Sequence, residues 1–207
     1  MSINVRLDAD PAQASRLAQL QAVFAAACNA LVPFVREHRC WHRVTLHHLA
    51  YHALREQFPQ LGSQMACNAI YSVSRVCRIL FRHPASPWNL SRLGDGPLPM
   101  LKFAPTAPVY FDRHTLSLRP DGLSLFTLDG RMHFSLSLAP AIVERFSREK
   151  LREIVLSSQR NAYWLTFHFG SAVDGLRPDE LPEYVMVYET GQVRQVEGGT
   201  KEVVSWR

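Results

Sequence analysis

The residues best suited to chemistry lie between positions 63 and 82. At 3.6 residues per turn, six polar side chains of this stretch fall on one helix face: Gln64, Asn68, Tyr71, Arg75, Arg78 and Arg82. This face has no Asp or Glu, whereas a solvated helix face usually mixes charges of both signs. Amides can pair with base edges, guanidiniums can bind phosphates, and an aromatic ring can stack on a base. The face therefore has two interpretations, a nucleic-acid contact or a merely polar surface rich in arginine.

Basic and aromatic residues around this stretch favour the first interpretation. Residues 36–83 hold seven arginines against two acidic residues, and Trp41, Tyr51 and Tyr71 are interleaved with them. Six histidines lie in the same region, where they add hydrogen-bonding capacity and, below about pH 6.5, positive charge. A concentrated basic region with aromatic residues is typical of proteins that bind nucleic acid.

The charge of the whole chain is also uneven. Residues 1–160 contain nineteen Lys and Arg against eleven Asp and Glu, whereas residues 161–207 contain four against seven. The net charge of +5 thus combines a basic body with an acidic final segment. This asymmetry predicts a polyanionic partner for the basic body. A hydrophobic fraction of 47% with 20% charged residues excludes a disordered or fibrous protein.

Familiar catalytic and metal-binding patterns are missing. The four cysteines form no CxxC pair, which excludes a zinc ribbon by spacing. His48 and His52 have the i, i+4 spacing of metal ligands, but a third ligand and the glutamate of zinc peptidases are lacking. Asp112, Asp121 and Asp129 fall at strand ends or turns, where aspartate commonly serves the backbone. We therefore expect no metal, no cofactor and no enzymatic activity.

Three helices would position the basic region. Apolar residues at helical spacing predict helices over residues 10–38, 45–58 and 63–81. Asp10 followed by Pro11 is a typical helix start, and Thr45 and Ser63 are candidate N-caps of the next two helices. Residues 17–35 are uncharged, but their amphipathic pattern indicates a core helix rather than a membrane span.

From residue 100 onward the pattern becomes that of strands. Alternation predicts strands over residues 109–111, 115–118, 123–128, 132–138, 150–158, 163–169 and 184–188, besides an early one over 3–7. Asp129-Gly130 is a strong hairpin signal, and Asp121-Gly122 marks another turn. A helical turn is expected over residues 140–146. We expect the first strand to join the later sheet, so that the helices form an insertion.

The chain is thus predicted to be an α+β protein of four segments. These are a first strand (residues 1–9), a three-helix subdomain (10–83), an antiparallel β domain (84–170) and an acidic C-terminal segment (171–207).

Three stretches resemble TnpB proteins, the transposon-encoded, RNA-guided nucleases related to compact type V CRISPR effectors. Residues 54–75 (LREQFPQLGSQMACNAIYSVSR) are similar to the family's N-terminal helical region. Residues 109–118 with 126–131 (VYFDRHTLSL, FTLDGR), and residues 150–156 with 163–167 (KLREIVL, YWLTF), resemble strands of its wedge domain. The resemblance covers about residues 1–170 and implies a wedge-type β-barrel or sheet with an inserted recognition subdomain.

The resemblance also implies roles for individual residues. The recognition helices and wedge of the family bind a guide RNA and its heteroduplex with target DNA, and read a flanking DNA motif. By position, Ser63, Gln64 and Asn68 match the helix start that faces this motif, and Tyr51 lies on the preceding helix. Phosphate contacts are expected from the arginines of the third helix and RNA contacts from strand ends: Arg75, Arg78, Arg82, Arg113 and Arg131. For Arg113 and Arg131, ordinary hairpin-end charge is an equal alternative.

The sequence departs from the family in its catalytic part. TnpB proteins carry a RuvC nuclease with three acidic residues and a zinc ribbon, and neither a Gly-x-Asp-x-Gly strand nor a CxxC pair occurs here. We expect a nuclease-deficient, cytoplasmic protein that binds a structured or guide RNA, with RNA-directed target DNA as a further partner. The alternative is a protein-interaction module that docks a separately encoded nuclease or effector through its acidic end and the aromatics Tyr184 and Tyr188.

Overall fold

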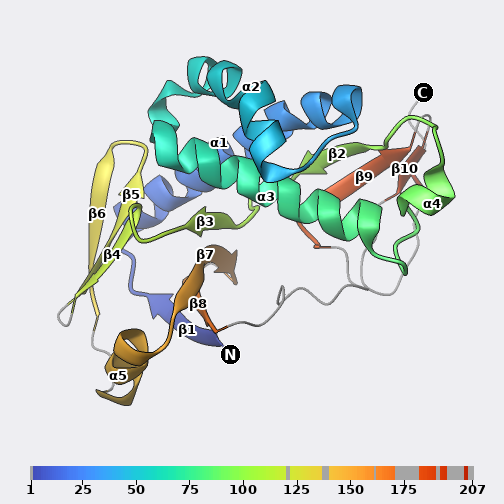
Figure 1. The fold of residues 1–207 in the computed structure, drawn as a ribbon. Coiled ribbons are helices and arrows are strands. Elements are labelled where there is room, and N and C mark those ends of the chain that lie inside the picture. The colour runs from blue at the N-terminus through green and yellow to red at the C-terminus, as the bar shows by residue number, and fades with distance from the viewer. Residues whose placement is uncertain are drawn as a thin grey trace.

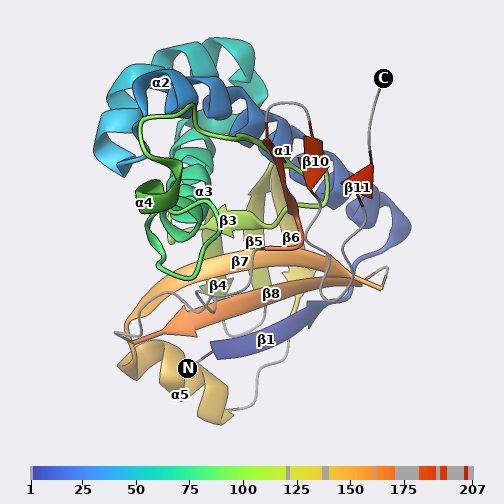
Figure 2. The same cartoon turned by 90° about the vertical axis from the view of Figure 1, so that its right-hand side faces the viewer.

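Three long helices lie together on one side of the molecule, and the strands form three separate sheets beside and beneath them (Figure 1, Figure 2). The computed structural model describes residues 2–119, 122–136, 140–160, 162–170, 182–189, 192–194 and 203–204.

The first helix, α1 (Pro11–His38), matches its prediction closely. Asp10 accepts a hydrogen bond from the backbone N–H of Gln13, whose side chain bonds back to the Asp10 backbone, and this capping box starts the helix. Arg39 ends it in the left-handed conformation with φ of 46°. By length and hydropathy α1 could cross a membrane. Half of its most apolar window is buried inside the fold.

The next two helices are correctly predicted but begin earlier than expected. Helix α2 (Arg43–Gln57) has His42, not Thr45, at its N-cap. A 3-10 turn (Pro59–Leu61) then leads into α3 (Gly62–Arg82), where Gly62 has φ of 67° and Leu61 is the N-cap. Ser63 therefore lies within the first turn of α3 and does not cap it. A short helix α4 (Leu90–Leu93) follows.

The first sheet confirms that the start of the chain joins a later hairpin. Its strand order is β1 (Ser2–Leu7), β8 (Ala162–Phe169), β7 (Leu151–Gln159) and β3 (Val109–Phe111), all antiparallel. Apolar side chains alternate inward, so Ile3, Val5 and Leu7 are buried. Helix α5 (Pro140–Arg148) packs Phe146 against two rings of β8.

A second sheet joins two segments that the sequence analysis separated. Its order is β11 (Val203–Val204), β10 (Gln192–Arg194), β9 (Val185–Glu189) and β2 (Met100–Phe103). Strand β2 was not predicted, because it has only four residues and follows a run rich in proline and glycine. It pairs with β9, so the proposed boundary after residue 170 divides this sheet.

The third sheet is a meander of β4 (Leu116–Arg119), β5 (Gly122–Thr127) and β6 (Gly130–Ser135). The hairpin is confirmed, but its two turn residues are Leu128 and Asp129, and Gly130, at φ of 109°, pairs with Thr127 and begins β6. Asp121, predicted in the other turn, and Leu138, predicted at the end of the last strand, lie outside the described residues.

The architecture is α+β, and among the described strands no sheet closes into a barrel. Helices and sheets share one hydrophobic core, which includes Phe24 of α1, Leu80 of α3 and Phe167 of β8. The helical segment is thus packed on the strands rather than standing apart from them.

Candidate nucleic-acid interface

The first half of the polar face of α3 packs against strands rather than facing solvent. Gln64 donates from Nε2 to Oδ2 of Asp112 at 2.6 Å, and Asn68 donates from Nδ2 to the backbone carbonyl of Tyr110 at 2.9 Å. Asn68 is buried, with only 6% of its surface exposed to solvent. The prediction that these amides point outward, ready for base edges, is therefore wrong.

The middle of the face is closed by a carboxylate from β7. Tyr71 donates its hydroxyl proton to Oε1 of Glu153 at 2.8 Å, and Nη1 of Arg75 lies 3.5 Å from Oε2 of the same residue. Arg75, also 6% exposed, donates to the hydroxyl of Tyr110 at 2.8 Å. Burial first, and then the Glu153 charge and hydrogen bond, raise the pKa of Tyr71 well above its usual 10.0. Neither Tyr71 nor Arg75 presents the free surface that we predicted.

The helical wheel could not reveal these partners. Glu153 is 82 residues away from Tyr71 along the chain, and Asp112 is 48 residues away from Gln64. The acids missing from the helix face are thus supplied by strands of the first sheet and by the residue after β3. Polar residues at a helix–sheet boundary are indistinguishable from exposed ones in the sequence unless the packing is known.

The last turns of α3 do remain exposed. Arg78 and Arg82 are both exposed and line a hollow with Arg39 and His42 of the link between α1 and α2. Of the other residues predicted from the helices, Ser63 is exposed, and Tyr51 is half-buried with its ring stacked on His47 at 4.5 Å between centroids.

A second basic surface lies on the third sheet. We call it the outer hairpin face, formed by Ser117, Arg119, Ser124, Phe126, Arg131 and His133. Cross-strand register places Ser117, Ser124 and His133 in one row, and Phe126 beside Arg131 in another. Side chains alternate across strands, so these residues share one side of the sheet, whereas Leu125 and Met132 are buried on the other.

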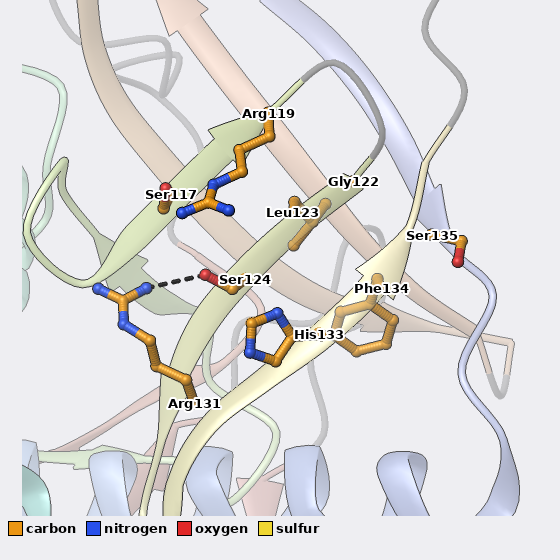
Figure 3. Close-up of a pocket in the computed structure, with 9 residues that line it drawn as sticks. All are labelled: Ser117, Arg119, Gly122, Leu123, Ser124, Arg131, His133, Phe134 and Ser135. Atoms are coloured by element: carbon orange, nitrogen blue, oxygen red, sulfur yellow. Dashed lines mark hydrogen bonds between the residues drawn. The ribbon is translucent and has the colours of Figure 1, made fainter.

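The outer hairpin face encloses a hollow of about 540 Å³ (Figure 3). Figure 3 shows the guanidinium groups of Arg119 and Arg131 on the same side of the sheet as Ser124 and the ring of His133. No carboxylate is among the residues that line this hollow in the described part of the chain. The hollow is therefore positively charged and rich in hydrogen-bond donors.

Arg131 is held in place by its neighbours. It donates from Nη1 to Oγ of Ser124 and from Nη2 to the backbone carbonyl of His114, both at 3.0 Å. Its guanidinium also lies over the Phe126 ring, 4.9 Å from the centroid, and Phe126 is 41% exposed. Arg113, for which an RNA contact was also predicted, is exposed in the turn that precedes β4.

Helix α1 anchors this sheet from the inner side. Arg16 donates to Oδ1 of Asp129 and to the hydroxyl of Thr127, and Gln13 donates to the carbonyl of His133. The hydrogen bond from Thr127, and then that from Arg16, hold the pKa of Asp129 below its usual value. The one acid of the hairpin turn is thus already paired.

Sequence reasoning found Arg131 but missed Arg119, Phe126 and His133. Their signal was present, because the alternation within each strand and the Asp129-Gly130 turn together fix which residues share a face. They were missed because the polar, arginine-rich face of residues 64–82 was the stronger pattern in the sequence and was chosen instead.

The described residues contain no group of three or more His, Cys, Asp or Glu placed to hold a metal ion. Cys28 and Cys77 are fully buried, and burial raises the pKa of the Cys28 thiol to about 12. Tyr184, named as a docking aromatic, is half-buried, and its side chain is hydrogen-bonded to that of Tyr110.

Comparison of the chain with protein-family models and with curated proteins gave no match.

Proposed function

We propose that this protein binds nucleic acid, and RNA in particular, across the outer hairpin face. The observation that carries the proposal is the hollow lined by Arg119, Arg131 and His133, with no carboxylate among its described lining residues. A surface of this kind attracts phosphates through charge and offers planar donors for bidentate contacts.

The chemistry of the face suits unpaired RNA better than a duplex. Phe126 offers an exposed ring on which a base can stack, and stacking requires bases that are not paired inside a helix. Ser117, which is half-buried, can exchange a hydrogen bond with a ribose 2′-hydroxyl, which DNA lacks. The preformed contacts of Arg131 reduce the entropy that it would lose on binding.

We further propose that the bound RNA is of the guide type and that target DNA is met only through it. The support is the sequence resemblance to TnpB proteins over residues 1–170, together with the order of strand, helices and strands in which β1 pairs with β8. Protein docking, the second candidate, loses the support of Tyr184, whose side chain is hydrogen-bonded to Tyr110.

The test compares the full chain with Arg119→Ala/Arg131→Ala, using fluorescence anisotropy of a labelled RNA stem-loop with a single-stranded tail. We expect the double variant to bind at least about tenfold more weakly, and its salt slope to flatten by about 0.7 for each phosphate that the variant no longer binds. Arg6→Ala, an exposed arginine on β1, is the matched control and should bind as the unchanged protein does.

Equal binding by the double variant and the control would refute the assignment of this face. Recovery from cells of a stable, ribonuclease-resistant protein complex with no enriched RNA would instead favour the docking function.

A further inference from the structure

A second hollow, of about 270 Å³, lies where α1 ends, α2 begins and α3 finishes. The link between α1 and α2 contributes Arg39 and His42 to its lining. Helix α3 contributes Arg78 and Arg82, and α4 contributes Leu90. Trp41, which also lines it, is buried and packs its ring against Phe81 at 5.0 Å. The short link that carries Arg39 and His42 is thus fixed to the core.

The lining of this hollow carries three guanidinium groups and no carboxylate within the described part of the chain. Arg39 is further fixed by its left-handed backbone and by hydrogen bonds to the carbonyls of Gly94, at 2.8 Å, and Gly96. Those two carbonyls belong to the loop after α4, which therefore helps to determine where the Arg39 guanidinium lies. Arg39, Arg78 and Arg82 are exposed, and Arg39 is held in place by these hydrogen bonds, so its charge favours an anion more than that of a flexible surface arginine would.

The charge of the site indicates which anion it would take. A phosphomonoester carries about −1.5 to −2 at neutral pH, whereas an internal phosphodiester carries a single negative charge. Three guanidiniums complement the dianion better.

We propose that this hollow binds a terminal phosphate group, that of an RNA end. The assignment of the phosphate to RNA rests on the proposed function, whereas the recognition of a phosphomonoester rests on the hollow alone. The outer hairpin face would then hold the nucleotides, and the hollow at the end of α3 would select chains that end in phosphate.

The experiment uses the full chain and three short RNAs of one sequence, ending in a 5′-phosphate, a 3′-phosphate or hydroxyls only. Affinities are measured by isothermal titration, with inorganic phosphate as a separate probe. We expect one phosphorylated RNA to bind about tenfold more tightly than the hydroxyl RNA, as an added charge-assisted contact would give. Arg82→Ala should abolish this difference, and Arg82→Lys should retain part of it because the charge remains.

Arg119→Ala/Arg131→Ala separates the two proposals, because it should weaken all three RNAs by the same factor and leave the phosphate preference intact. Equal affinities for the three RNAs in the unchanged protein would overturn the phosphate site, even if RNA binding itself is observed. Loss of the preference in the hairpin variant but not in Arg82→Ala would also overturn it. Binding of inorganic phosphate that depends on Arg82, with no RNA binding, would support the site and refute the proposed function.

Discussion

Glu153 is the residue on which the buried half of α3 depends. Its carboxylate accepts a hydrogen bond from the Tyr71 hydroxyl, and its Oε2 lies 3.5 Å from Nη1 of Arg75. Both charged side chains are largely buried, with 12% of Glu153 and 7% of Arg75 exposed. Without this carboxylate, the buried guanidinium would keep its hydrogen bond to the Tyr110 hydroxyl but would lack the negative charge that Glu153 supplies. Removing one member of a buried ion pair is costly, whereas removing both can be nearly neutral.

Glu153→Ala should therefore lower the free energy of unfolding by about 3 kcal/mol, measured by urea denaturation. Glu153→Gln should cost less, since an amide oxygen can still accept from Tyr71. The double variant Arg75→Met/Glu153→Leu, which removes both charges, should recover much of this stability. If Glu153→Ala stays within about 0.5 kcal/mol of the unchanged protein, the pair contributes nothing.

His168 gives the same cluster a pH dependence. Burial lowers the pKa of this histidine below its usual 6.5, Glu153 opposes that shift, and Arg75 adds to it. As the pH falls below 6.5, the unfolded chain takes up a proton that the folded protein resists, so stability must fall with it.

We expect the free energy of unfolding to decrease between pH 7 and pH 5, with His168 contributing up to about 1.4 kcal/mol per pH unit. His168→Gln should remove this contribution and give a shallower slope. The measurement is chemical denaturation at several pH values. If stability falls with pH equally steeply in the unchanged protein and in His168→Gln, His168 has the same pKa in the folded and unfolded states, which would contradict this prediction.

At the scale of elements, local patterns predicted most of the fold. The N-cap at Asp10 and the hairpin between β5 and β6 are decided by neighbouring residues; the N-cap occurs as expected, and the hairpin turns one residue earlier than expected. Strand β2 escaped prediction because four residues carry too weak an alternation, and its partner β9 lies more than eighty residues further along. The start of α2 shifted because His42 caps it without a side-chain hydrogen bond, a start that leaves no sequence signal.

The outer hairpin face depends on one close approach between strands. A Cβ at Gly122 would lie 2.5 Å from the carbonyl oxygen of Phe134, a backbone atom of the adjoining strand that cannot move away alone. Only glycine therefore allows β5 and β6 to pair at this point.

Gly122→Ala should force these strands apart, with a decrease of about 1–3 kcal/mol in stability and faster hydrogen exchange of amides in β5 and β6. RNA binding should weaken with it, because Arg131 and Ser124 would no longer be aligned across the two strands. Ser117→Ala, on the same face but without a clash, is the control for stability and hydrogen exchange, and Arg6→Ala is the control for RNA binding. Unchanged exchange in Gly122→Ala would mean that the sheet tolerates the added methyl group.

At the scale of the whole molecule, the sequence could indicate a basic protein with an α+β order of elements, but not which basic residues are exposed. That question was settled by contacts between distant segments, such as Gln64 with Asp112 and Tyr71 with Glu153. Arg131 was found because its exposure follows from a local hairpin. Arg75 was misjudged because its burial follows from the packing of α3 on a sheet.

The same packing predicts that the helical segment cannot unfold by itself. Separation of α3 from the strands would expose Arg75 and Asn68 together with the shared core, so helices and sheets should unfold in a single transition. Trp41, buried with its ring against Phe81 of α3, and Trp164 on β8 can report on the two parts separately. In variants that retain only one of these tryptophans, with the others replaced by phenylalanine, fluorescence in urea should give coincident midpoints that agree with circular dichroism. Two distinct midpoints would instead show that residues 10–83 form an independent domain, and the buried contacts of α3 would then be too weak to join it to the sheets.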